Sequence, residues 1–469
     1  MNAVAAPAVS TRPRVIVLEF NELSPTLMRE FMAQGVLPNF SRLHGDAQAY
    51  VTDAEEAAPN LEPWIQWVTA HSGQSYRDHG VYHLGDGHKL KTKQVWDLLS
   101  DHGLKVWVCG SMNLRYDRPI NGAVLPDPWA AGTDPFPGDL FDAYFPFVQR
   151  NVQEYTNTRV PLSHSDYLRF VSFMAAHGLS LKTASAIARQ LGGERLTRKG
   201  KWRRATILDR LQFDVFRWYY QKERPDFSTF FVNSTAHLQH MHWRNMDPAP
   251  FKLKPGDDEQ REYQHAIRYG YQMMDQIVGQ TLEMAGPDVT VVMMSALSQQ
   301  PCLRYEDSGG KTFYRPREFE RVLEYAGVPR PYRVEPVMSE QFHVHFDSEP
   351  AALAAATALR GLRLEGQPAM EVKHDGASVF AGCSVFRQLD RDVPLARPGG
   401  EPRPFFELFY QVEGLKSGMH HPDGILWIRD PARPHREHPD KVPLRDVAPT
   451  MLAAFGVTPP GYMTGTSLL

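Results

Sequence analysis

Three histidines fall within six residues of the stretch Asn233–Arg244, which reads NSTAHLQHMHWR. They are His237, His240 and His242. Imidazole nitrogens bind zinc and other divalent metals, but metal sites for ester chemistry usually combine them with carboxylates. The stretch contains no acidic residue, so a carboxylate ligand would have to come from another part of the chain.

Composition argues against several classes of protein. A chain of 469 residues exceeds the usual limit for one hydrophobic core, so we expect a large domain with insertions or a second, smaller domain. The net charge of -3 favours neither nucleic acid nor an anionic membrane as a partner. The cysteines, Cys109, Cys302 and Cys383, form no CxxC pair, which indicates a reducing compartment.

The N-terminal segment MNAVAAPAVSTRPR lacks the pattern of a signal peptide, and no later segment is long and apolar enough to span a bilayer. We therefore expect a soluble, cytoplasmic protein. The sequence makes no prediction of the oligomeric state.

Four short apolar runs, each followed by polar residues, predict the strands of a sheet. They are Val15–Phe20 and the runs within residues 105–111, 227–234 and 288–295. Helical patterns lie between them, at 24–35, 93–103 and 269–286. This alternation is typical of an α/β fold with a mostly parallel sheet between helices, whose functional residues lie at the carboxyl ends of the strands.

Two segments interrupt this pattern. Residues 135–224 are aromatic and rich in helical patterns, and they predict a helical insertion. Their basic run ERLTRKGKWRR is interpreted as a solvated helix face, or alternatively as a lid that attracts phosphate. Residues 330–387 predict a small α+β cap. The predicted core comprises 14–134, 225–329 and 388–469, and residues 1–13 are expected to form a flexible tail.

Several separated segments resemble the alkaline phosphatase superfamily, in particular its type I phosphodiesterase and nucleotide pyrophosphatase branch. GVLPNFSRL is similar to the family's GxLPNFxRL, and the sequence HGV at 79–81 to its HGI turn. GLKSGMHHPDGILWIRDP resembles the late GxHxPDGI stretch, and LRDVAPTMLAAFGVTPPGYMTG resembles the closing motif. The resemblance extends from Val15 to Leu469, apart from the two insertions, and implies the fold of that superfamily.

In that family, two divalent metals bound by Asp and His activate a Ser or Thr nucleophile. Carried over by motif, the resemblance places Asn21 at the first Asp and Glu62 or Pro63 at the nucleophile. It places His240 at the histidine of a DxxxH pair and His420 at the late histidine. Three further ligand positions are taken by residues that bind no metal: Ala236, Ala296 and Leu297. The sequence therefore does not support a two-metal mechanism.

The remaining histidines suggest a simpler site. His240, His420 and His237, which lies one turn before His240, predict a mononuclear site for one divalent metal, zinc or manganese. The alternative interpretation is that His237 and His242 are polar loop residues, that His240 is a relic held by hydrogen bonds, and that no metal is bound.

Glu62 and Asn21 are the candidate catalytic residues. Glu62 could act as general base, nucleophile or ligand, or it could be an ordinary acidic residue at a helix start. Glu22 and Trp64 are the candidates for substrate binding, although strand alternation points Glu22 away from the face of Asn21 until the loop turns. Trp64 could instead pack in the core.

We therefore expect a divergent enzyme, a hydrolase or transferase, that acts on a small-molecule anionic ester such as a phosphate-bearing one. Its site would use a single metal or none. The alternative is a pseudoenzyme that keeps the fold and binds a ligand or a partner protein without turnover.

Overall fold

The structure of the protein is a computed structural model, which describes residues 12–130, 132–156, 162–337, 340–412 and 414–469. A nine-stranded sheet forms its centre, in the order β20-β2-β19-β6-β1-β5-β3-β4, with β21 paired to β2. The strands are β1 Val15–Phe20, β2 Gln48–Asp53, β3 Val106–Cys109, β4 Gly122–Leu125, β5 Phe227–Val232, β6 Thr290–Ser295, β19 Asp423–Arg429, β20 Arg436–Glu437 and β21 Val442–Pro443.

The five neighbours β6, β1, β5, β3 and β4 all run parallel, and β19 is antiparallel to both β6 and β2. All four apolar runs identified in the sequence belong to this parallel group. The prediction of an α/β fold with a mostly parallel sheet is therefore confirmed. Because β1 lies between β5 and β6, the loops that follow these three strands meet at one edge.

Helices cover both faces of the sheet. Alternate residues of the strands point to opposite faces, and each face packs against helices in its own hydrophobic core. Ile16 and Leu18 of β1 belong to one core, and Val15 and Val17 to the other. The first core includes side chains of α1 Pro25–Ala33, α2 Pro38–Gly45, α10 Ala205–Glu223 and α13 Ala266–Ala285. The second includes side chains of α3 Pro63–Ser72, α5 Val95–Asp101 and α17 Val447–Ala453.

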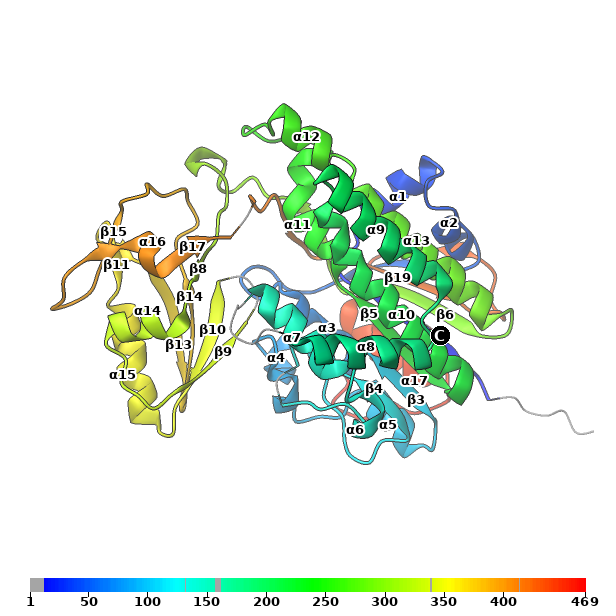
Figure 1. Ribbon diagram of the computed structural model, residues 1–469. Helices are drawn as coiled ribbons and strands as arrows, with labels where there is room; N and C mark the ends of the chain where they lie inside the picture. Colours follow the sequence, from blue (N-terminus) through cyan, green and yellow to red (C-terminus); the bar gives the residue numbers. More distant parts are fainter. Residues whose placement is uncertain (1–11, 131, 157–161, 338–339, 413) are drawn as a thin grey trace, which may run out of the picture.

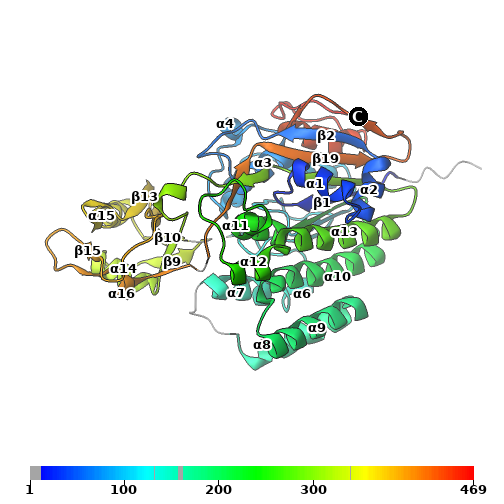
Figure 2. The same cartoon turned by 90° about the horizontal axis from the view of Figure 1, so that it is seen from above.

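A group of helices lies between β4 and β5 in the chain: α6 Gly138–Phe141, α7 Phe145–Thr156, α8 His164–Ala176, α9 Leu181–Thr197 and α10. Figure 2 shows α8 and α9 on the outer side of α10, away from the sheet. Among the described residues, no helix combines the length and the apolar character needed to cross a membrane.

A second unit lies beside the core (Figure 1) and has its own hydrophobic cluster, whose buried residues run from Tyr314 to Phe409. We call this unit the cap, and the predicted boundaries of 330–387 stay a prediction. Its main elements are β8 Tyr314–Pro316, α14 Phe319–Ala326, β9 Arg333–Pro336, β10 Gln341–His345, α15 Glu349–Arg360, β13 Met370–Asp375, β14 Ser378–Cys383, α16 Phe405–Leu408 and β17 Phe409–Gln411. Two chain segments link the cap to the core, and their described residues are 302–313 in one and 412 and 414–417 in the other.

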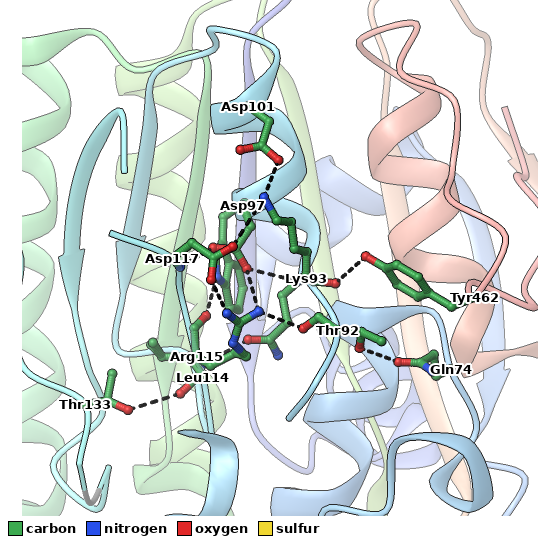
Figure 3. A network of polar contacts seen from close by, with 12 residues as sticks. Gln74, Thr92, Lys93, Asp97, Asp101, Leu114, Arg115, Asp117, Thr133 and Tyr462 are labelled. Carbon is green, nitrogen blue, oxygen red and sulfur yellow. Dashed lines mark hydrogen bonds and ion pairs between the residues drawn. The ribbon is translucent and has the colours of Figure 1, made fainter. Parts of the chain in front are cut away.

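A polar network fastens the C-terminal segment to the start of α5 (Figure 3). The Lys93 Nζ lies 2.7 Å from Asp101 Oδ2 and 3.2 Å from Asp117 Oδ2. The backbone oxygen of Lys93 accepts a hydrogen bond from Tyr462 Oη, at 2.9 Å. Because these charged side chains are exposed, each ion pair contributes less than about 1 kcal/mol to stability. The network therefore positions chain segments more than it stabilises the fold.

Candidate functional site

The candidate site lies at the carboxyl ends of β1, β5 and β6. Asn21 and Glu22 directly follow β1, and Glu22 adopts a left-handed backbone conformation with φ 60°. Asn233 follows β5 and occupies the N-cap position of α11 Ser234–Met246, without a capping hydrogen bond from its side chain, and α11 carries His240. His420 lies on β18 Gly418–His421, which pairs with β7 Ser298–Pro301 just beyond β6.

Glu22, His240 and His420 converge on one point. The Glu22 Oε2 lies 3.0 Å from His240 Nε2 and 3.5 Å from His420 Nε2. The centres of the two imidazole rings are 5.2 Å apart. Among the described residues, this is one of two groups of three potential metal ligands, and we call it the Glu22 cluster. The other group, His44, His435 and Glu437, is largely exposed.

Both imidazoles of the Glu22 cluster are oriented by backbone carbonyls. His240 Nδ1 lies 3.1 Å from the oxygen of Gly418, and His420 Nδ1 lies 2.8 Å from the oxygen of Leu61. A carbonyl oxygen accepts only, so each Nδ1 carries the proton and donates it. In a neutral imidazole, each Nε2 then turns a lone pair toward the Glu22 carboxylate. This is the tautomer that binds metals, held by the kind of outer hydrogen bond found at metal sites.

Burial disfavours protonation of the two histidines of the Glu22 cluster. It lowers the pKa of His420 to about 3 and lowers the pKa of His240 below its usual value. Burial acts to raise the pKa of Glu22, whereas His240, His420 and Lys416 together act to lower it, so that the pKa falls to about 2 and the carboxyl group is ionised. The negative carboxylate and the two nitrogen lone pairs repel one another unless a cation lies between them. A divalent metal binds to neutral imidazoles and an ionised carboxylate, which is the protonation state described here. The residues therefore fit one metal ion.

Hydrogen bonds fix the Glu22 carboxylate. Asn21 Nδ2 donates to Glu22 Oε1 at 2.9 Å, and the amide of Gln299 donates to Oε2. Trp67 Nε1 donates to Asn21 Oδ1 at 2.8 Å, which settles the orientation of the Asn21 amide. The Asn21 Nδ2 also donates to Asn233 Oδ1, at 2.7 Å. Asn21 therefore acts as a positioning group for Glu22, and its amide is fully engaged by protein partners.

The place of a second metal is apolar. Ala296 and Leu297, which the resemblance aligns with an Asp-His ligand pair, are completely buried. Leu297 packs against Ala54 and Leu61 in a small hydrophobic cluster. Neither group of potential metal ligands among the described residues includes this place, and desolvation of a cation there would be costly.

Glu62 lies at the start of α3 next to the Glu22 cluster. Its Oε2 is 3.4 Å from His420 Nδ1, and it makes no side-chain hydrogen bond that caps the helix. Burial raises the pKa of Glu62 to about 8, although Lys416 acts to lower it. Its side chain remains 30% exposed, so a substrate can reach it. A carboxyl group whose pKa is raised toward neutral pH next to a candidate metal site is suited to general acid or base catalysis.

His237, His242 and Trp64 lie outside the Glu22 cluster. His237 is exposed on α11, and its ring is not among the ligand atoms that come together. His242 stacks on Tyr263 with ring centres 4.5 Å apart. Trp64 is half-buried, and its Nε1 donates to the oxygen of Tyr82 at 2.8 Å. The roles predicted for His237 and Trp64 stay predictions.

Sequence reasoning did not include Gln299 or Trp67 among the site residues. Gln299 lies two residues beyond Ala296 and Leu297, which replace the ligand pair. A polar residue so close to the two replaced ligands is the sequence signal that could have identified Gln299. Trp67 offers no such signal, because its role depends on the position of Asn21 across the fold.

No protein-family model matches the chain, and no curated protein matches it. The similar solved structures include two of phosphonoacetate hydrolase from Sinorhizobium meliloti 1021, one in complex with phosphonoformate and one with phosphonoacetate. Both are 11% identical to this chain and cover 95% of it and 96% of their own chain, with TM-scores of 0.44 and 0.43. At that similarity they carry no argument about the activity of this chain.

Proposed function

We propose that the protein is a divergent alkaline phosphatase-superfamily enzyme that uses one divalent metal ion to hydrolyse or transfer a small anionic, phosphate-bearing ester. The observation that carries this proposal is the Glu22 cluster, in which two imidazole lone pairs face one buried carboxylate. The superfamily assignment rests on the motifs that the sequence shares with the family, together with the parallel sheet.

Glu22, His240 and His420 would hold the metal. Two imidazole nitrogens and one carboxylate oxygen suit zinc, and manganese also accepts such ligands. When bound, the metal supplies a Lewis acid and lowers the pKa of a bound water. Asn21 and Gln299 keep the Glu22 carboxylate directed at the two histidines, so the ligands are in place before the metal arrives.

Glu62 would move the proton. With a pKa of about 8, the carboxyl group is largely protonated at neutral pH and can donate a proton to the oxygen of the leaving group. Its ionised form can take a proton from an attacking water or alcohol. Its carboxylate oxygen faces His420, so the proton is moved beside the proposed metal site.

A second candidate function is ligand binding without turnover. The apolar cluster of Ala54, Leu61 and Leu297 at the second-metal position favours it, because the family's two-metal chemistry is lost there. A protein of this kind would bind the metal and an anion and release both unchanged.

The test is turnover of 4-nitrophenyl phosphate and bis(4-nitrophenyl) phosphate by the purified protein with added zinc or manganese. We expect metal-dependent release of 4-nitrophenol that falls about 100-fold or more in Glu62→Gln and in His240→Ala. Glu437→Gln at the exposed group of ligands is the matched control and should keep full activity. Metal binding at the Glu22 cluster without turnover of any ester in a wider panel would favour the binding protein.

A further inference from the structure

Two lysines face each other where the chain passes between the core and the cap. Lys311 lies on one linking segment and Lys416 on the other, and they form an antiparallel bridge in which Lys416 N donates to Lys311 O at 3.0 Å. Residues directly opposite each other in such a pair project to the same side, with Cβ atoms about 5 Å apart. Like charges in this arrangement repel and are destabilising unless an anion lies between them.

Neighbouring backbone contacts hold both lysines in this register. Val412 N donates to Phe313 O at 2.9 Å, and Cys302 N donates to Ser417 O at 2.8 Å. Ser417 N donates in turn to the backbone oxygen of His240, at 2.7 Å. The Lys416 segment is therefore fastened directly to the helix that carries a proposed metal ligand.

Neither lysine forms an ion pair within the described residues, which leave out 338–339 and 413, although the charges of the more distant Glu22, Glu62 and Glu340 act on Lys416. Aromatic rings surround them instead. Lys311 Nζ lies 4.6 Å from the ring centre of Phe386 and 5.0 Å from that of Phe313, and Lys416 Nζ lies 5.7 Å from that of Phe313. Cation–π contacts hold an ammonium group in place and leave its charge available.

The charge of the lysine pair acts on the candidate site. Glu22 and Glu62 are both among the groups whose charge acts on the ammonium of Lys416, together with Lys311 itself. Burial lowers the pKa of Lys416, and the charge of Lys311 lowers it further. The ammonium groups of Lys311 and Lys416 repel each other beside the proposed metal site, and an anion bound between them would relieve this repulsion.

We propose that Lys311 and Lys416 form a subsite for a doubly charged oxyanion, a phosphate or phosphonate group of the substrate, next to the Glu22 cluster. Two lysine ammonium groups match the charge of such a dianion, and lysine binds phosphate as a point charge. This inference rests on the proposed function in one respect, because it takes the bound anion to be part of the substrate. The binding of the anion itself requires only the two lysines.

The test is calorimetric titration of inorganic phosphate into the metal-stripped and the zinc-loaded full-length protein, at low ionic strength. Wild type should bind phosphate in both forms, more weakly as salt is added. Lys311→Met and Lys416→Met should each weaken binding about tenfold or more, and Lys416→Arg should keep part of it. Lys252→Met is the matched control, because Lys252 lies near the same linking segment but is exposed and paired with Asp307 at 2.6 Å.

Equal phosphate affinity in wild type, Lys311→Met and Lys416→Met would overturn the subsite, as would the absence of binding by wild type at millimolar phosphate. Thermal unfolding of each variant identifies a folding defect, and the two lysine variants can be judged separately. Metal-dependent turnover with lysine-independent phosphate binding would refute only the subsite. Lysine-dependent binding by metal-stripped protein that turns over no ester would support the subsite and count against the enzyme.

Discussion

Replacing Glu22 by glutamine tests whether the Glu22 cluster binds a metal. The substitution keeps the shape of the side chain but removes the charge that faces His240 Nε2 at 3.0 Å and His420 Nε2 at 3.5 Å. Without metal, the new amide can donate to an imidazole lone pair, so we expect the free energy of unfolding to change by no more than about 1 kcal/mol. The effect should emerge only when metal is present.

The magnitude follows from the role of Glu22 as a direct ligand. Loss of an outer hydrogen-bond partner at a metal site costs about 10- to 100-fold in affinity, so loss of the charged ligand should cost about 100-fold or more. A 100-fold loss corresponds to about 2.7 kcal/mol. At a zinc concentration 100 times the wild-type dissociation constant, wild type gains about 2.7 kcal/mol of stability, and Glu22→Gln should gain less than about 0.5 kcal/mol.

Zinc affinity by competition with a chromogenic chelator, together with thermal unfolding with and without zinc, measures both quantities. Glu437→Gln is the control, because its carboxylate lies 3.7 Å from His44 in the exposed group of potential ligands. Unchanged zinc affinity in Glu22→Gln would refute the assignment. Loss of zinc in Glu437→Gln instead would place the metal in the exposed group.

Two further predictions concern stability. Trp67→Phe removes the donor to Asn21 Oδ1 at a fully buried position and should lower the free energy of unfolding, measured in urea, by about 2 kcal/mol or more. Trp64 is only half-buried, so Trp64→Phe should lower it by less than about 1.5 kcal/mol. Equal losses in the two variants would contradict the role of Trp67. Burial raises the pKa of Asp127 from 3.8 to about 7, so the folded state binds more protons than the unfolded state between these pH values and stability falls as pH rises through that range, by up to about 4 kcal/mol. Asp127→Asn should show a shallower loss of stability between pH 4 and 8, and an unchanged slope would show that the group does not titrate in this way.

The sequence by itself determined the sheet. Runs such as Val15–Phe20 and Phe227–Val232 are apolar at nearly every position, and only a strand covered on both faces can bury all of them. Helical patterns between such runs then require parallel connections. Motif resemblance also indicated that His240 and His420, 180 residues apart in the chain, belong together, and their rings lie 5.2 Å apart.

The tertiary structure alone decided that Glu22 joins the two histidines. Simple strand alternation would point Glu22 away from the face of Asn21. The left-handed backbone conformation at Glu22 changes that direction. Such a conformation is uncommon in a non-glycine residue, and the local sequence gives no signal of it. The same applies to Trp67, which meets Asn21 only after α3 packs on β1, and to the pairing of Lys311 with Lys416 across two linking segments. Such contacts depend on the relative placement of distant elements, which local periodicity and propensity do not encode.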